Sequence, residues 1–89
     1  MNLQILAQNI RRLRTARRFS QKALADSAGL SLPAIKNLEG AKNEPRVYTL
    51  QSIAKALDVE LQDLFLPVRV MNSVRFRSTK RMLSRENIL

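Results

Sequence analysis

Two residue types on which much enzyme and metal chemistry depends are missing, because the 89 residues include no cysteine and no histidine. Without cysteine there is no disulfide framework and no thiolate zinc site. Without histidine the commonest metal ligand and the commonest general base are absent as well. We therefore expect no enzymatic activity, no metal and no cofactor within these residues.

Long apolar runs are missing too. No stretch approaches the roughly 20 apolar residues that a membrane-spanning helix needs, and the N-terminus has no basic region followed by an apolar core, the pattern of a secretion signal. We expect a cytoplasmic protein with no membrane partner. At this length the chain is one small domain with a modest core, for which dimerisation would add stability.

The charge is strongly positive and unevenly distributed. Sixteen lysines and arginines stand against seven acidic residues, a net charge of +9. Residues 1–66 hold ten basic and six acidic side chains, whereas residues 67–89 hold six basic and one acidic. This excess favours a polyanionic partner, with nucleic acid ahead of a membrane surface. We interpret residues 67–89 as a basic extension that is either a linker or a dimerisation arm.

The first part of the chain has the apolar period of amphipathic helices. A helix over residues 2–17 is predicted by apolar residues at three- and four-residue steps, namely Leu3, Leu6, Ile10 and Leu13. A second helix is predicted over 21–28, because Ser20 is a good N-cap and Gly29 suits the left-handed turn that ends a helix. A third helix over 31–39 follows, with Ser31 as its cap and Pro33 in its first turn.

Two further helices complete an all-α pattern. The fourth is predicted to start at a Thr49 cap and to end before Asp58, which tolerates the left-handed conformation. The fifth is short and is predicted to close the core with Val59, Leu61, Leu64 and Phe65, stopping at Pro67. Helices as short as 21–28 and 31–39 are not stable alone in water, so the others must fix their mutual angle. Two helices joined by one tight turn are the arrangement of a helix-turn-helix reader of DNA.

Beyond Pro67 the apolar pattern changes to a strand-like alternation. The alternating apolar residues, with Met71 as an exception, are Val68, Val70, Val74 and Phe76. A lone strand needs a partner, so this segment is either a dimer-forming edge or an extended arm. Ser78 and Thr79 are expected to cap a last helix over 80–89, whose apolar face is incomplete. We therefore interpret the chain as the N-terminal part of a longer protein.

Residues 3–66 resemble the XRE family of bacterial regulators, the phage repressor and Cro type of helix-turn-helix. The resemblance is carried by residues 17–21 (Arg-Arg-Phe-Ser-Gln), Leu24-Ala25, Ala28-Gly29-Leu30-Ser31, Ile35, Leu38-Glu39, Lys42, Pro45, Thr49-Leu50, Ile53-Ala54, Leu57 and Leu64-Phe65. It implies a five-helix lambda-repressor-like domain with the third helix in the major groove, where every base pair has a distinct donor and acceptor pattern. In one departure, the family's glycine two residues after the glutamate is replaced by Ala41, and Gly40 comes one residue early.

The resemblance assigns base reading to the outward residues of the third helix, which are Ser31, Leu32, Pro33, Lys36 and Asn37. Leu32 and Pro33 would contact thymine methyl groups, and the alternative for both is helix initiation and local packing, which explains Pro33 at least as well. Lys36 would reach guanine acceptors or a phosphate. Asn37 would pair with adenine or hold the DNA backbone.

The phosphate contacts implied by the resemblance involve Gln21, Lys42, Asn43 and Arg46. Gln21 opens the second helix, whose N-terminus offers backbone N–H donors and a dipole that favours an anion. The other three lie in a loop expected to follow the sugar–phosphate backbone, where contacts set register rather than sequence choice. Ordinary solvation is the alternative for each. Arg14 and Glu39 are expected to form a partly buried structural ion pair between the first helix and the end of the third.

Two hypotheses of function follow. In the first, the chain is a homodimeric regulator, expected to be a repressor, that binds double-stranded DNA at a pseudo-palindromic operator with half-sites about 34 Å apart. Its dimer contact would come from the fifth helix and the strand-like segment. In the second, it is an antitoxin-type module that also binds a protein partner through residues 67–89. Segments 74–81 and 84–89 also resemble, more weakly, a linker to a zinc peptidase-like domain, which would require a His-Glu-x-x-His helix in a longer chain.

Overall fold

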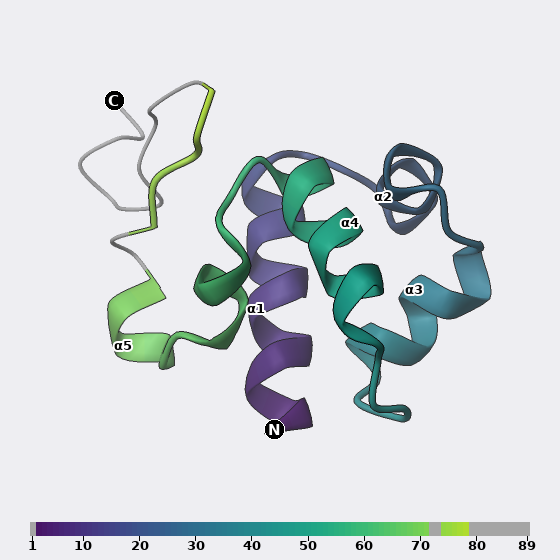
Figure 1. Ribbon diagram of the computed structural model, residues 1–89, viewed down its shortest axis with the longest axis horizontal. Coiled ribbons are helices and arrows are strands. Elements are labelled where there is room, and N and C mark those ends of the chain that lie inside the picture. The colour runs from purple at the N-terminus through teal and green to yellow at the C-terminus, as the bar shows by residue number, and fades with distance from the viewer. Residues whose placement is uncertain (1, 72–73, 79–89) are drawn as a thin grey trace.

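The computed structural model describes residues 2–71 and 74–78 (Figure 1). Its elements in chain order are α1 (Leu3–Ala16), α2 (Gln21–Ala28), α3 (Leu32–Glu39), α4 (Val47–Leu57), the 3₁₀ helix η1 (Leu61–Phe65) and α5 (Val68–Met71). The all-α class predicted from the sequence is therefore confirmed. The helix expected over 80–89 lies outside the described residues. Within 2–71 and 74–78, no helix combines the length and the apolar character needed to cross a membrane.

Helices α2 and α3 begin after the serine caps predicted for them, and α2 ends at the predicted glycine. The hydroxyl oxygen of Ser20 accepts a hydrogen bond from the backbone N–H of Ala23 at 2.9 Å, and the Ser31 hydroxyl accepts one from Ala34 at 3.2 Å. Each bond satisfies a donor that has no partner inside its helix. Gly29 ends α2 with φ 70° and ψ 32°, the left-handed conformation expected there. The turn between α2 and α3 is thus specified by local chemistry.

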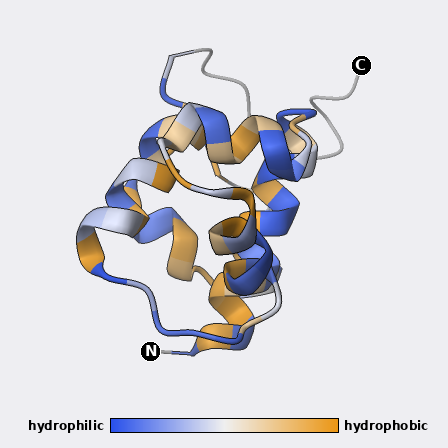
Figure 2. Cartoon of the chain, turned by 90° about the vertical axis from the view of Figure 1, so that its right-hand side faces the viewer, coloured by the Kyte–Doolittle hydropathy of each residue, from blue (hydrophilic) through white to orange (hydrophobic). Residues whose placement is uncertain are grey.

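Every helix from α1 to α5, together with the segment 74–76, contributes side chains to one core. Helix α1 packs against α3, η1 and α5, while α4 packs against α2 and η1, and α2 packs against α3. Hydrophobic and hydrophilic segments alternate along the helices, as amphipathic helices around one core require (Figure 2). The buried apolar side chains are Leu6, Ile10, Leu13, Leu24, Ala25, Ile35, Leu38, Leu50, Ile53, Ala54, Leu57, Val59, Leu64, Met71, Val74 and Phe76. Full burial of each large aliphatic side chain in this set contributes about 1.5–3 kcal/mol.

Two predicted details of α4 and η1 are wrong. Helix α4 begins at Val47, and Arg46 occupies its N-cap without a side-chain capping bond, so Thr49 is inside the first turn and is not the cap. Phe65 does not close the core, because it is 39 % exposed, whereas Leu64 is fully buried. In a 3₁₀ helix residues three apart share a face, so Leu61 and Leu64 point to the same side and Phe65 points away.

A buried asparagine attaches η1 to α1. The side-chain amide of Asn9, only 1 % exposed, donates to the carbonyl oxygens of Leu64 at 2.9 Å and Leu66 at 2.8 Å. These bonds satisfy two carbonyl groups at the end of η1 that have no partner in a regular helix. Removing the amide would leave those carbonyls unpaired in the interior.

The strand-like alternation predicted beyond Pro67 is only partly correct. Residues Val68–Met71 form a helical turn, α5, so the interpretation of Val68 and Val70 as strand residues is wrong. The segment 74–76 is extended, and it buries Val74 and Phe76 in the same core as the helices. The predicted division between residues 1–66 and 67–89 stays a prediction.

Asp58 holds the end of the described chain against α4. It takes φ 64° after the last residue of α4, as predicted, and its carboxylate accepts hydrogen bonds from the backbone N–H and the hydroxyl of Ser78. The same carboxylate pairs with Arg17 at 3.2 Å. The guanidinium of Arg17 lies over the rings of Phe19 and Phe76, at 5.4 and 5.5 Å from their centroids. These contacts connect the α1–α2 loop, the end of α4 and the extended segment.

Candidate nucleic-acid interface

One face of helix α3 packs against the core, and the opposite face is exposed. Its inward side chains, Ile35 and Leu38, are 0 % and 7 % exposed and pack with Leu24 and Ala25 of α2 in the common core. Because Pro33 stands in the first turn, where its missing N–H leaves no bond unmade, it does not weaken the helix. The opposite side of α3 has no helix packed on it in Figure 1, where α3 lies at the edge of the molecule.

The five candidate base-reading residues differ in exposure. Ser31, Pro33 and Lys36 are exposed, whereas Leu32 and Asn37 are half-buried. They are brought together along one helix, at its N-terminal end and one turn further on. The half-burial of Leu32 leaves both readings open, since part of the side chain packs locally and part can meet a ligand. The hydroxyl of Ser31 is already engaged in capping α3, although a hydroxyl oxygen retains a second lone pair and its own proton.

Glu39, the last residue of α3, has a buried carboxylate that joins three helices. Its side chain is 1 % exposed and forms an ion pair with Arg14 of α1, with Nε 2.6 Å from Oε2. A second bond runs from Arg14 Nη2 to Oε1 at 3.1 Å, which makes the pair bidentate. Gln21, the first residue of α2, donates its amide to Oε1 at 3.1 Å. Arg14 also donates to the carbonyl oxygen of Phe19 at 2.8 Å.

The sequence analysis paired Glu39 with Arg14 alone. It did not predict the contacts of Arg11 and Gln21 with the same carboxylate. Arg11 Nε lies 3.6 Å from Glu39 Oε1, with a side chain 62 % exposed. A signal for Arg11 was present, because it precedes Arg14 by three residues and so lies on the same face of α1. No local signal pairs Gln21 with Glu39, since that contact depends on the angle between α2 and α3.

The loop after α3 contains an unexpected left-handed residue. Gly40 has φ −89°, an ordinary value, whereas Ala41 has φ 55°. The chain therefore turns two residues after Glu39, at the position where the sequence has alanine in place of the expected glycine. The turn is held by hydrogen bonds from the N–H of Ala41 to the Leu38 carbonyl at 3.2 Å and from the N–H of Lys42 to the Asn37 carbonyl at 3.0 Å.

The remaining phosphate candidates differ in their exposure. Lys42, Asn43 and Arg46 are all exposed, and neither Lys42 nor Arg46 has an ion-pair partner within 2–71 or 74–78. Gln21 is half-buried, and its amide bond to Glu39 fixes its orientation. Tyr48, which the sequence analysis did not single out, is 62 % exposed in the first turn of α4. The sequence signal that could have pointed to Tyr48 is its position as an aromatic residue two places after Arg46.

The described residues were also searched for groups of side chains that could bind a metal ion. No group of three or more histidine, cysteine, aspartate or glutamate side chains within them is arranged to hold a metal ion. The surface ion pairs Arg17–Asp58, Lys22–Asp26 and Arg77–Glu60 lie outside α3 and the loop that follows it. The exposed side chains of α3 and of the loop after it include the positive charges of Lys36, Lys42 and Arg46.

Comparison with known proteins finds helix-turn-helix proteins by sequence. A helix-turn-helix family model matches residues 10–64. The chain is 31 % identical over 70 residues to an uncharacterized HTH-type transcriptional regulator, y4dL, of Sinorhizobium fredii, which covers 79 % of this chain and 35 % of that protein. It is 34 % identical over 59 residues to the HTH-type transcriptional regulator DdrOP3 of Deinococcus deserti, covering 66 % and 46 %. The chain thus spans less than half the length of either relative.

Solved structures share the fold. The restriction-modification controller protein C.AhdI of Aeromonas hydrophila superposes with a TM-score of 0.70 at 33 % identity, over 72 % of this chain and 97 % of that one. The DNA-binding domain of the P22 C2 repressor superposes with a TM-score of 0.66, also at 33 % identity, over 72 % and 84 %. The predicted lambda-repressor-like helix-turn-helix fold is therefore confirmed.

Proposed function

We propose that this chain, which belongs to the helix-turn-helix family of DNA-binding transcriptional regulators, reads specific sequences of double-stranded DNA with α3 in the major groove. The observation that carries the proposal is the two-sided character of α3. Its inner face is fixed by core packing and by the Glu39 cluster, while its outer face is open. A rigid helix with a free polar face can hold side chains at the fixed distances that base edges require.

In this proposal the outward residues divide the work by chemistry. Lys36 donates to the acceptors of a guanine or to a phosphate, and Asn37 pairs with adenine or holds the backbone. Leu32 and Pro33 lie against thymine methyl groups. Ser31 offers its hydroxyl at the end of the helix that enters the groove first.

The phosphate contacts position the helix in the groove. Gln21 has two amide protons, one of which is engaged by Glu39, so the other is available to a phosphate oxygen in a fixed direction. Lys42, Asn43 and Arg46 would follow the next stretch of backbone, and Tyr48 adds a phenolic hydroxyl beside them. Such contacts set the register and supply the salt-dependent part of the affinity.

We further propose that the protein acts in the cytoplasm as a homodimeric repressor at a two-fold symmetric operator. A single small module buries limited surface on DNA, so pairing two is the usual route to useful affinity. The partly exposed apolar side chains of Phe65 and Val70, 39 % and 36 % exposed, are the candidates for the contact between copies. An antitoxin-type role is the second candidate, and its motivation is a groove lined in part by residues 74–77.

The direct test replaces the two polar reading residues. A preferred duplex is selected from a random pool, and its affinity for Lys36→Ala and Asn37→Ala variants is compared with that of an unrelated duplex. We expect each variant to lose about 1–3 kcal/mol of discrimination against the wrong base at one position, with a smaller loss on unrelated DNA. The matched control is Lys55→Ala, which removes an exposed lysine from the last turn of α4, outside the proposed interface. An unchanged sequence preference in both variants would show that α3 is not the reader.

A further inference from the structure

The extended segment 74–78 is held against the helices by two kinds of contact. Val74 and Phe76 are each 2 % exposed and belong to the common core. The exposed end of the segment, residues 77–78, is fixed by hydrogen bonds and an ion pair instead. The segment is therefore packed as a structural part of the domain and not as a solvated tail.

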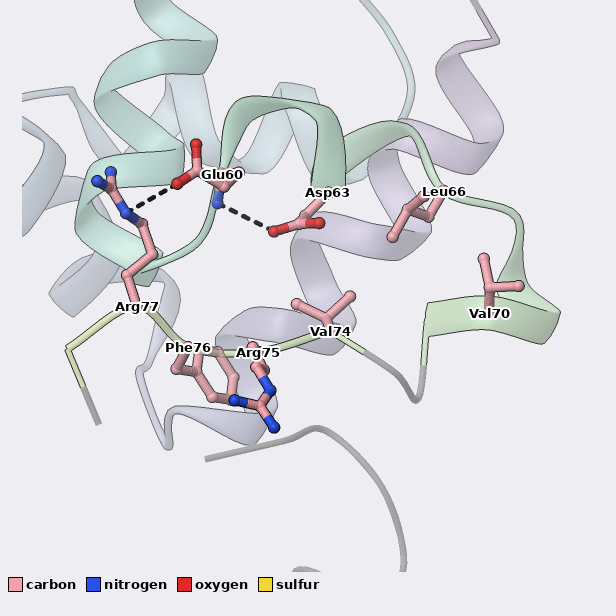
Figure 3. A pocket seen from close by; sticks show the side chains of 8 residues that line it. All are labelled: Glu60, Asp63, Leu66, Val70, Val74, Arg75, Phe76 and Arg77. Atoms are coloured by element: carbon pink, nitrogen blue, oxygen red, sulfur yellow. Dashed lines mark hydrogen bonds and ion pairs between the residues drawn. The ribbon is translucent and has the colours of Figure 1, made fainter. Parts of the chain in front are cut away.

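Asp58, which follows α4, receives the polar end of the segment. Its carboxylate accepts hydrogen bonds from the N–H of Ser78 at 2.9 Å and from the Ser78 hydroxyl at 2.5 Å, and its carbonyl oxygen accepts the N–H of Arg77 at 2.6 Å. Arg77 also pairs with Glu60, its Nε lying 3.0 Å from Oε1 (Figure 3). Because Glu60, Arg77 and Ser78 are all exposed, these bonds can open without unfolding the core.

Arg17 connects the docked segment to the loop that precedes α2. The carboxylate of Asp58 that binds Ser78 also pairs with Arg17 Nη1 at 3.2 Å. The Arg17 guanidinium lies over the ring of Phe76 in the segment and over the ring of Phe19 in the loop, 5.5 and 5.4 Å from their centroids. A cation within about 6 Å of an aromatic face is attracted to the ring. The contact of Arg17 with the loop thus shares its partners with the segment.

The loop in turn meets the cluster around Glu39. The carbonyl oxygen of Phe19 accepts a hydrogen bond from Arg14 Nη1 at 2.8 Å, and the same guanidinium forms the bidentate pair with Glu39. Gln21, two residues after Phe19, donates to Glu39 as well. A displacement of Phe19 would therefore disturb the side chains that join the first residue of α2 to the last residue of α3.

We infer that docking of segment 74–78 and binding of DNA are coupled, with Arg17 as the positioning residue that links them. The docked segment lets Arg17 hold Phe19, and so the Glu39 cluster, in the arrangement that presents α3 to DNA. The inference rests on the proposed DNA binding but not on which bases α3 reads. Coupling between two sites is reciprocal, so bound DNA must stabilise the docked segment by the same factor by which docking strengthens DNA binding.

The first arm of the test measures the effect of DNA on the segment in the full chain. Amide hydrogen exchange followed by NMR reports the opening of the N–H groups of Arg77 and Ser78, whose acceptors are both on Asp58. A saturating amount of the duplex selected from a random pool should slow both exchange rates about fivefold or more, since allosteric coupling is typically 5- to 150-fold. A purely structural role of the segment would leave these rates unchanged.

The second arm measures the effect of the link on DNA affinity. Arg17→Met keeps an unbranched side chain and removes the guanidinium. The control Arg69→Met removes the same charge from an exposed site in α5, so its loss of affinity measures the electrostatic part alone. We expect Arg17→Met to bind the selected duplex about fivefold or more weakly than this control, and to lose the slowing of exchange by DNA. Ser78→Ala, which changes no charge, should weaken binding to a smaller extent.

Three results would overturn the inference: equal affinities of Arg17→Met and Arg69→Met, exchange rates at Arg77 and Ser78 that DNA does not change, or slowing that persists in Arg17→Met. If thermal melts show Arg17→Met unfolded at the assay temperature, Ser78→Ala decides, and wild-type affinity in that variant overturns the inference. A wild type that binds the selected duplex no better than the pool would refute sequence reading instead, and the same comparisons on unselected DNA then decide the coupling.

Discussion

Replacing Glu39 by glutamine tests whether one carboxylate fixes the geometry of the DNA-reading helices. The change keeps the shape of the side chain and removes its charge. Glutamine has a single acceptor oxygen, whereas Glu39 now accepts two bonds from Arg14 and one from Gln21. The new amide would also point its own N–H groups toward other donors. Arg14, only 16 % exposed, would be left with an uncompensated charge.

The size of the effect follows from the burial of the pair. Removing one partner of a fully buried ion pair costs about 3–5 kcal/mol, and the remaining exposure of Arg14 brings our expectation to about 2–3 kcal/mol. For a domain of this size each kcal/mol lowers the melting temperature by about 4–8 °C, so Glu39→Gln should lower it by roughly 8–24 °C. Circular dichroism melts at fixed concentration measure the shift.

A matched control is available on the surface of α2. Asp26 pairs with Lys22 at 3.5 Å, and their side chains are 68 % and 73 % exposed. Asp26→Asn makes the same acid-to-amide change and should shift stability by less than about 0.5 kcal/mol. A double-mutant cycle with Arg14→Met should give a coupling energy of about 0.5–3 kcal/mol. Equal effects of Glu39→Gln and Asp26→Asn would refute a structural role for the carboxylate.

The remaining predictions concern backbone strain and a missing cap. Ala41→Gly should raise the free energy of unfolding, because a left-handed non-glycine residue costs about 1–2 kcal/mol, against about 0.5–1 for the entropy of glycine. Gly29→Ala should lower it by about 1 kcal/mol, since no atom lies within 4 Å of the added methyl and only the strain of φ +70° remains. Thermal melts decide both, and an alanine that stabilises position 29 would contradict the reasoning. Arg46→Ser should add a side-chain cap to α4 and stabilise the fold by about 0.5–2 kcal/mol. It should also reduce the salt dependence of DNA binding by about one phosphate contact, measured by fluorescence anisotropy at several salt concentrations; an unchanged slope would exclude Arg46 from the interface.

The parts of the fold that were predicted correctly are those with strong local signals. The ends of α2 were exact, because a capping serine precedes it and a left-handed glycine follows it. The start of α4 was missed for the same reason, since Arg46 provides no capping signal and Thr49, the nearest capping residue type, took its place.

Other errors came from signals with two meanings. Pro67 was expected to stop the fifth helix, and η1 does end before it, at Phe65; but proline also suits the start of a helix, and α5 begins at the next residue. Val68 and Val70 alternate as in a strand, but an alternation of so few residues cannot distinguish a strand from a single helical turn such as α5. The contact of Gln21 with Glu39 required the packed angle of two helices, which no local pattern contains.

The central claim is that α3 reads base sequence, and selection of bound duplexes from a random pool tests it most directly. The salt dependence of the selected duplex is measured beside that of the unselected pool. We predict a two-fold symmetric sequence with half-sites about 34 Å apart, bound at least a thousandfold more tightly than the pool, as is usual for specific recognition. Equal binding to all sequences, varying only with salt concentration, would reduce the interaction to electrostatic attraction and contradict the claim.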